Sequence, residues 1–175
     1  PQAPSIAAAR MAVTCGLGLD GAMASAVNML DDIHGGAGEQ AVELYHWLDD
    51  AISAGQSPTE ATVEMIARWQ SERSKFVPGF GHRLHKPKDP RAPRLLGLVD
   101  EAAQAGTVDG RFALSGRSIE EVLAAQKGKP VPMNIDGATA VIYAELGFAG
   151  PLARGLFCLS RSVGVVAHAW EQISQ

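Results

Sequence analysis

The sequence predicts an all-α fold of about seven or eight helices. Apolar residues recur at three- and four-residue spacing along most of the 175-residue chain. Glycines follow several of these apolar stripes at places where a helix would end, and no stretch alternates strictly between apolar and polar residues. Together these observations favour helices joined by loops and exclude a sheet-based core.

The clearest stripe runs through Ala41, Leu44, Tyr45, Leu48 and Ile52, which fall on one face of a helix. Shorter stripes with the same spacing predict further helices. They consist of Leu95, Leu98, Val99 and Ala102; of Ile119, Val122 and Leu123; and of Leu156, Leu159, Val163, Val166 and Trp170.

Capping sequences indicate where helices begin and end. Residues 57–60, Ser-Pro-Thr-Glu, combine an N-cap, a proline at the first helical position and an acid in the first turn. Ser118 and Glu121 have the spacing of a capping box, and Gly55 and Gly106 stand where C-terminal caps are expected. The long connections are then 75–90, 106–117 and 127–133.

Composition narrows the class of protein. A formal net charge of −4, with basic residues scattered along the chain, gives no reason to expect nucleic acid. No apolar run is long enough for a membrane span, and no signal peptide is expected. Two cysteines, Cys15 and Cys158, do not form a disulfide framework, which favours a reduced, cytoplasmic setting. Both ends of the chain look cut, since it starts without Met and stops directly after a helical pattern.

The first loop with chemical potential contains His34, followed by the pair Gly35 and Gly36. A helix ends just before it and another begins a few residues later. Unpaired N–H groups at the start of that next helix would disfavour imidazolium, leaving a neutral His34 able to donate one hydrogen bond. The alternative is a histidine that only bonds a turn.

The second loop holds Phe80 between two glycines and runs on to His82 and Arg91. Glycines let the backbone come close to a bulky ligand. An arginine beside a histidine is a suitable receptor for a carboxylate next to a carbonyl or hydroxyl group. The alternative is a solvated surface turn.

The third loop ends in Asn134 and Asp136, just before an apolar helix. Either residue could be only an N-cap, but a desolvated Asp136 could instead act as a base towards carbon. Arg161 lies inside the last apolar helix, where it needs an anion. That anion is either a structural acid such as Glu145 or a substrate carboxylate.

In this order the motifs resemble those of the citrate synthase superfamily, over about residues 5–172. Asp-Asp-Ile-His-Gly-Gly-Ala-Gly (31–38) is similar to the family's first catalytic histidine loop, although Gly38 stands where the family usually has Asn. Pro-Gly-Phe-Gly-His-Arg (78–83), with Asp-Pro-Arg (89–91), is similar to the second. Asn-Ile-Asp (134–136) and Ser-Arg-Ser-Val-Gly (160–164) resemble the catalytic aspartate and second substrate arginine segments. Details such as Asn-Ile-Asp-Gly and the ending around His168 look more like citryl-CoA lyases, including the lyase module of ATP-citrate lyase.

The resemblance implies a role for each residue. Asp136 would be the base on the acetyl methyl group, and neutral His34 the donor to the thioester oxygen. His82 would move the proton of the partner's carbonyl or alcohol, while Arg91 and Arg161 hold its carboxylates. The coenzyme A site would be lined by Val77, Pro78, Gly79, Phe80 and Gly81. No metal and no covalently bound cofactor is implied, because the coenzyme A thioester is itself a substrate beside a di- or tricarboxylate.

The resemblance also implies a citrate synthase-like fold with a truncated large domain and a small domain. Residues 1–54 and 150–175 would belong to the large domain, and residues 55–149 to the small one. Family members are longer at both ends, where they carry a further substrate histidine and an arginine donated across a dimer. A homodimer is therefore expected, and the chain is either part of a longer protein or a reduced homologue.

Three hypotheses about function follow. The first is an enzyme, either a citryl-CoA lyase or a citrate synthase-type condensing enzyme, with direction and oxo acid left open. The second is a non-catalytic module that binds coenzyme A. The third is a metal site with two histidines and a carboxylate, built from His34, His82 and Asp136, which sequence spacing alone does not exclude.

Overall fold

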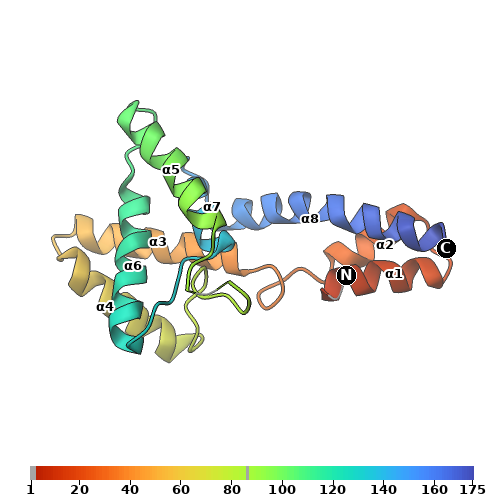
Figure 1. Ribbon diagram of the computed structural model, residues 1–175, viewed down its shortest axis with the longest axis horizontal. Coiled ribbons are helices and arrows are strands. Elements are labelled where there is room, and N and C mark those ends of the chain that lie inside the picture. The colour runs from red at the N-terminus through yellow and green to blue at the C-terminus, as the bar shows by residue number, and fades with distance from the viewer. Residues whose placement is uncertain (1–2, 86) are drawn as a thin grey trace. The chain divides into compact units, whose positions relative to one another are not determined.

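The computed structural model describes residues 3–85 and 87–175, and this part of the chain contains eight α-helices and no strand (Figure 1). The all-α prediction is confirmed. No helix in the described part combines the length and apolarity needed to cross a bilayer. The helices are α1 (Pro4–Thr14), α2 (Leu19–Val27), α3 (Ala37–Ser53), α4 (Pro58–Glu72), α5 (Arg91–Gln104), α6 (Arg111–Lys127), α7 (Ile135–Glu145) and α8 (Gly150–Ile173).

The chain divides into two compact units. The smaller unit contains the chain up to Gly36 together with Arg154–Gln175, and the larger unit contains Ala37–Ala153. The boundary after Gly36 lies before α3, because α3 packs against α4, α6 and α7. The division into a large domain (1–54 and 150–175) and a small one (55–149) stays a prediction.

The larger unit is built around α3. Its predicted stripe is real, since Leu44, Tyr45 and Leu48 have no exposed surface. They pack in one hydrophobic core with residues of α4, α6 and α7. Burying such side chains contributes about 1.5–3 kcal/mol each, so this core supplies most of the driving force for folding the unit. Its other large members are Ile66, Trp69, Phe112, Ile119, Leu123, Met133 and Val141.

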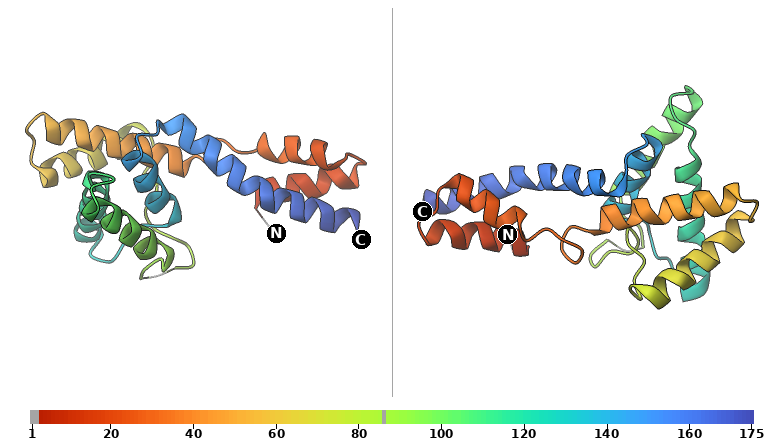
Figure 2. Two further views of the ribbon diagram at one scale, coloured as in Figure 1. Left: turned by 90° about the horizontal axis from the view of Figure 1, so that it is seen from above. Right: turned by 180° about the vertical axis from the view of Figure 1, so that it is seen from behind.

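The smaller unit has a core of small residues. Figure 2 shows α1 and α2, in red and orange, side by side. Their shared core consists mainly of alanines with Ile6, to which α8 adds Val165 and Ala169. The predicted stripe of α8 therefore does not form this core. Leu159, Val163 and Trp170 are 69%, 74% and 59% exposed, because the α8 residues buried here lie on a neighbouring face of the helix.

Several predicted caps are confirmed. Ser57 is the N-cap of α4 and accepts a hydrogen bond from the amide of Glu60. Gly55 and Gly106 follow α3 and α5 with φ angles of +99° and +72°, a conformation that side chains disfavour. Connections 75–90 and 127–133 also lie between helices.

The predicted start of α6 is wrong. Ser118 was expected to cap a helix after a loop at 106–117, but it lies inside α6, where its hydroxyl bonds that of Thr62. The helix begins at Arg111, since the Glu145 carboxylate accepts hydrogen bonds from the amides of Gly110, Phe112 and Ala113. A distant side chain thus replaces the local cap.

This tertiary cap gives a stability prediction. Glu145→Ala leaves amides at the start of α6 without their acceptor, so the free energy of unfolding should fall by about 1–2 kcal/mol. The matched control is Glu121→Ala, which removes the acid of the rejected capping box and should change stability by less than about 0.5 kcal/mol. Urea denaturation measures both. Equal losses would contradict the cap that Glu145 provides.

Candidate active site

His34 lies in the loop between α2 and α3 and is half-buried. Its Nε2 accepts a hydrogen bond of 3.2 Å from the Ser5 amide and lies 2.9 Å from the Ser5 hydroxyl. Ser5 is in the first turn of α1, whose N-cap residue Ala3 offers no side-chain cap. The imidazole therefore caps α1. Because Nε2 accepts, the neutral ring carries its proton on Nδ1, which can donate to a ligand.

The pKa of His34 is lowered, first by burial and then by the nearby Arg161 cation. Both effects favour the neutral imidazole that the sequence predicted. The predicted cause was different, namely the N-terminus of the following helix. The helix end that holds the ring is instead that of α1.

An arginine at the start of the smaller unit's part of α8 anchors the His34 loop. Arg154 donates hydrogen bonds to Asp31 and Asp32, with distances of 2.7 and 2.5 Å. Two charged bonds from one guanidinium restrict the backbone just before His34. No sequence pattern predicts this role of Arg154.

Arg161 and the His34 loop both lie close to the ring of Phe157. A side chain at Gly35, whose φ is +111°, would meet the ring of Phe157 at 2.9 Å, and the Arg161 guanidinium lies 5.3 Å from the same ring. Glu145, the structural acid considered for Arg161, accepts hydrogen bonds from the amides at the start of α6. Arg161 instead borders a hollow of about 380 Å³, which is also lined by Ala3, Ile6, Phe157, Ser160, Gly164 and His168.

His82 lies in the loop between α4 and α5. Its Nδ1 accepts hydrogen bonds of 3.0 Å from the amides of Leu84 and His85. The neutral ring therefore carries its proton on Nε2, on the side away from the backbone. The ring of His85 covers one face of it, with a centroid distance of 4.4 Å.

Arg91 is held by a buried carboxylate. Asp89 has no exposed surface and accepts from Nε, Nη2 and the backbone amide of Arg91, at 2.9, 2.7 and 3.1 Å. The side-chain hydrogen bond from Arg91 lowers the pKa of Asp89 to about 2, against the opposing effect of burial. The Asp89 hydrogen bond raises the pKa of Arg91, with a further contribution from the charge of Asp136. Asp89 therefore occupies the edge of the guanidinium formed by Nε and Nη2.

His82, His85 and Asp89 also bring ligand-type atoms within 4.8 Å of one another. Two features argue against a metal there. Arg91 already donates three hydrogen bonds to Asp89, and Nδ1 of His82 already accepts two backbone hydrogen bonds. We interpret this cluster as the anchor of Arg91.

The loop before His82 and the loop before Asp136 cross and pair. Phe80 and Met133 form an isolated antiparallel bridge. Around it the Gly81 amide donates to Pro132 O at 2.6 Å, and the Asn134 amide donates to Gly79 O at 2.9 Å. Segments more than fifty residues apart are thus joined by backbone hydrogen bonds.

Glycines make this close crossing possible. A side chain on Gly137 would meet the carbonyl oxygen of Gly79 at 2.3 Å, and one on Gly79, whose φ is +83°, would meet the Gly137 backbone at 2.7 Å. From the other side, the buried Tyr45 hydroxyl donates a hydrogen bond of 3.1 Å to Gly137 O. Burial raises the pKa of Tyr45, so this phenol keeps its proton.

Asp136 lies in the first turn of α7 and is half-buried. The N-cap of this helix is Asn134, whose Oδ1 accepts from the amides of Asp136 and Gly137. Asn134 therefore caps α7, and the Asp136 side chain is not needed as the cap. Its carboxylate is within electrostatic range of Arg91.

A hollow of about 510 Å³ opens beside the crossing. Of the five residues predicted to line a coenzyme A site, Val77, Phe80 and Gly81 border this hollow, whereas Pro78 and Gly79 do not. His82 also borders it. Sequence reasoning missed its four cationic side chains, those of Lys75, Arg83, Lys127 and Lys129.

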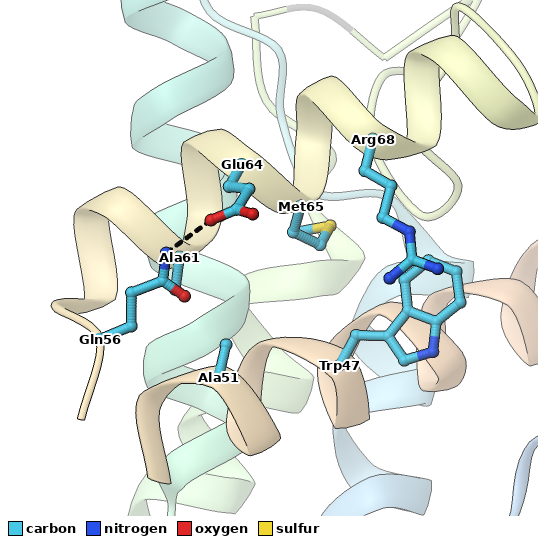
Figure 3. Close-up of a pocket in the computed structure, with 7 residues that line it drawn as sticks. All are labelled: Trp47, Ala51, Gln56, Ala61, Glu64, Met65 and Arg68. Atoms are coloured by element: carbon cyan, nitrogen blue, oxygen red, sulfur yellow. Dashed lines mark hydrogen bonds between the residues drawn. The ribbon is translucent and has the colours of Figure 1, made fainter. Parts of the chain in front are cut away.

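A third hollow lies between α3 and α4 and has a volume of about 110 Å³ (Figure 3). Arg68 lies over the ring of Trp47 at 4.8 Å, and Gln56 donates a hydrogen bond to Glu64. None of the predicted site residues borders this hollow. Arg68 in this hollow is therefore a suitable control position for binding experiments.

The predicted site residues are thus distributed over both units. His82, Arg91 and Asp136 belong to the larger unit, together with the loop 77–81. His34 and Arg161 belong to the smaller unit. Within each unit the structure brings its members together.

Residues 2–175 match the family model of the citrate synthase C-terminal domain. The chain belongs to the citrate synthase family. It is 32% identical to the citrate synthase of Haloferax volcanii over 152 residues, which are 86% of this chain and 37% of that protein. It is 30% identical to the citrate/2-methylcitrate synthase of Bacillus subtilis over 168 residues, or 94% of this chain and 42% of that protein. The chain therefore spans about two fifths of the length of these relatives.

Solved structures of the citrate synthase family share the fold. Citryl-CoA lyase from Hydrogenobacter thermophilus matches with a TM-score of 0.79 and 31% identity, over 98% of this chain and 62% of that chain. The complex of Thermoplasma acidophilum citrate synthase with carboxymethyl coenzyme A and oxaloacetate matches with a TM-score of 0.75 and 24% identity, over 98% and 44%. The predicted citrate synthase-like fold is confirmed.

The ion pair of the buried Asp89 with Arg91 predicts a contribution to stability that is lost in acid. The folded pKa of Asp89, about 2, lies below its ordinary value of 3.8. The pair therefore stabilises the fold fully above about pH 4, and this contribution is lost as the pH falls towards 2. Asp89→Asn should lower stability at neutral pH and flatten the pH dependence in that window. Urea denaturation at several pH values measures this. Asp100→Asn, in an exposed pair with Arg117, is the control and should have little effect.

The glycine contact predicts opposite effects of one substitution at two sites. Gly137→Ala forces the two loops apart and should destabilise the larger unit by more than about 2 kcal/mol. Gly97→Ala, in α5 with nothing near the new methyl group, should stabilise it by about 0.5–1 kcal/mol. Thermal denaturation distinguishes the signs. A neutral Gly137→Ala would mean that the crossing is loose.

Proposed function

We propose that this chain supplies the coenzyme A site and most of the catalytic residues of an enzyme that cleaves citryl-CoA to acetyl-CoA and oxaloacetate. The observation that carries the proposal is the paired crossing of residues 79–81 with 132–134. It joins the segment just before Asp136 to a hollow that is bordered by His82, by apolar side chains and by four cationic side chains, which we call the cationic rim. The similarity to a citryl-CoA lyase at 31% identity supports the direction.

The hollow suits coenzyme A by its chemistry. Phe80 and Val131 border the hollow with apolar side chains that suit an adenine ring. Lys127 and Lys129 supply positive charge for phosphate groups, as do Lys75 and Arg83. The thioester end of the ligand would then lie towards His82 and Asp136.

The proposed reaction proceeds by proton transfers without a redox step. His82 takes the proton from the hydroxyl group of citryl-CoA, and the bond between the carbinol carbon and the acetyl carbon breaks. The carbinol becomes the carbonyl of oxaloacetate, and the electron pair passes into the enolate of acetyl-CoA. His34 stabilises the enolate oxygen through Nδ1–H, and protonated Asp136 delivers a proton to the carbon. Arg91 and Arg161 hold the carboxylates throughout.

The reverse reaction, condensation of acetyl-CoA with a 2-oxo acid, is the second candidate. It uses the same residues with the proton transfers reversed, so that Asp136 is the base and His82 the acid, and the relatives at 30–32% identity that support it are citrate synthases. Citryl-CoA cleavage and citrate formation, assayed side by side, distinguish the two.

We further propose a homodimer in the cytoplasm, where the free Cys15 and Cys158 stay reduced. Sedimentation analysis tests the dimer.

The cationic rim predicts how coenzyme A binds. Lys127→Glu together with Lys129→Glu should weaken binding more than tenfold, because two attractions to phosphate become repulsions. The control is Arg68→Glu in the hollow of Figure 3, which should leave affinity within about twofold. Isothermal titration calorimetry with coenzyme A measures both. No binding by the unmodified chain would contradict the proposed function.

The role of Asp136 predicts a separation of binding from turnover. Asp136→Asn should reduce citryl-CoA cleavage by a factor of about 10²–10⁴, since it removes the acid that protonates the acetyl carbon. Coenzyme A affinity should change little. Binding without turnover in the unmodified chain would favour the non-catalytic module, and full activity in the variant would remove Asp136 from its role.

A further inference from the structure

The Asn134 side chain is hydrogen-bonded both to the loop that contains Gly81 and to the first turn of α7. Its Oδ1 accepts from the amides of Asp136 and Gly137 at 2.9 and 3.2 Å, while its Nδ2 donates to Gly81 O at 2.8 Å. Two amide donors on one side and a carbonyl acceptor on the other fix the orientation of the carboxamide. An ordinary N-cap uses only the first of these contacts.

The Oδ1 and Nδ2 atoms of Asn134 bond to different segments. The Oδ1 contacts hold the first turn of α7, which carries Asp136. The Nδ2 contact holds the carbonyl of Gly81, next to His82 and at the edge of the hollow. Gly81 is also bonded through its amide to Pro132 O, so its peptide groups are fixed on both sides. A shift of the loop 77–81 is thereby transmitted to the start of α7.

We propose that Asn134 is a positioning residue that couples the coenzyme A loop to the helix carrying Asp136. Binding of the coenzyme A ligand against Phe80 and Gly81 then also sets the place of the Asp136 carboxylate. The catalytic part of this inference rests on the proposed function. The structural part, a latch between the two segments, does not depend on it.

No other amino acid makes all these contacts. Serine and threonine can accept from the amides of α7 but carry no amide group that reaches Gly81. Aspartate keeps the acceptor oxygen but places a second oxygen where Nδ2 was, against the oxygen of Gly81. Asn134→Asp therefore removes the latch and preserves the cap, since a carboxylate at a helix N-terminus is favourable.

The first test uses hydrogen exchange on the chain without ligand. In Asn134→Asp the amide proton of Gly81 should exchange about tenfold faster, because Gly81 loses the hydrogen bond to its carbonyl and keeps only the one from its amide. The amide of Ala138, which donates to Asn134 O inside α7, should be unchanged. Unchanged protection of Gly81 would overturn the latch, whatever the chain binds.

The second test asks whether the latch matters for the ligand. Coenzyme A affinity should fall about tenfold in Asn134→Asp and in Asn134→Ser, the serine variant excluding an effect of added charge. The matched control is Thr139→Ala, which removes hydrogen bonds to Ile135 O and Asp136 O in the same helix turn without touching the loop. Its affinity should stay within twofold at similar loss of thermal stability.

The outcomes separate this inference from the proposed function. If the unmodified chain binds no coenzyme A, the proposed function fails and hydrogen exchange alone decides the latch. If it binds and both Asn134 variants bind equally well, the coupling is wrong while the proposed function stands. With turnover, the coupling further predicts that both kcat and KM worsen in Asn134→Asp, whereas a purely structural role would lower only the amount of folded protein.

Discussion

The antiparallel pairing of Phe80 with Met133 is the contact on which the site in the larger unit depends. Neither loop has a regular structure that would fix its path, and each is fixed by the other through backbone hydrogen bonds. The cost of ordering two long loops is offset by the buried side chains of Phe80 and Met133, which join the main core. The pairing joins the start of α7 to the loop that carries His82 and borders a hollow of about 510 Å³.

Backbone amides also prepare the two histidines. His34 Nε2 and His82 Nδ1 each accept from main-chain N–H groups, so each ring is left with one defined donor when neutral. The available nitrogens differ, Nδ1 for His34 and Nε2 for His82. Carboxylates orient two arginine side chains in a similar way. Asp89 accepts hydrogen bonds from Arg91, and Asp31 and Asp32 in the His34 loop accept from Arg154. Preorganised groups of this kind stabilise charge without reorganising during a reaction.

Sequence reasoning succeeded where the cause was local. The apolar stripe of α3, the Ser57 cap and the glycines after α3 and α5 are properties of a few neighbouring residues, and all are found. The motifs around His34, His82, Asp136 and Arg161 identified the family because their order along the chain is specific.

Sequence reasoning failed where a distant side chain decides. Glu145 sets the start of α6, Ser5 holds His34, and the lysines of the 127–129 turn line the hollow beside His82. Each of these contacts joins segments separated by tens of residues, and no local pattern encodes such pairings. The outward stripe of α8 is a further case, because periodicity identifies a face without saying what covers it.

A nuclear magnetic resonance titration of the isotopically labelled chain with coenzyme A tests most directly whether the paired loops form the ligand site. The amide signals of Gly79 and Gly81 on one loop, and of Asn134 and Asp136 on the other, should shift along a single saturation curve. Shifts confined to the hollow between α3 and α4, or shifts in one loop without the other, would contradict a ligand site built on that pairing.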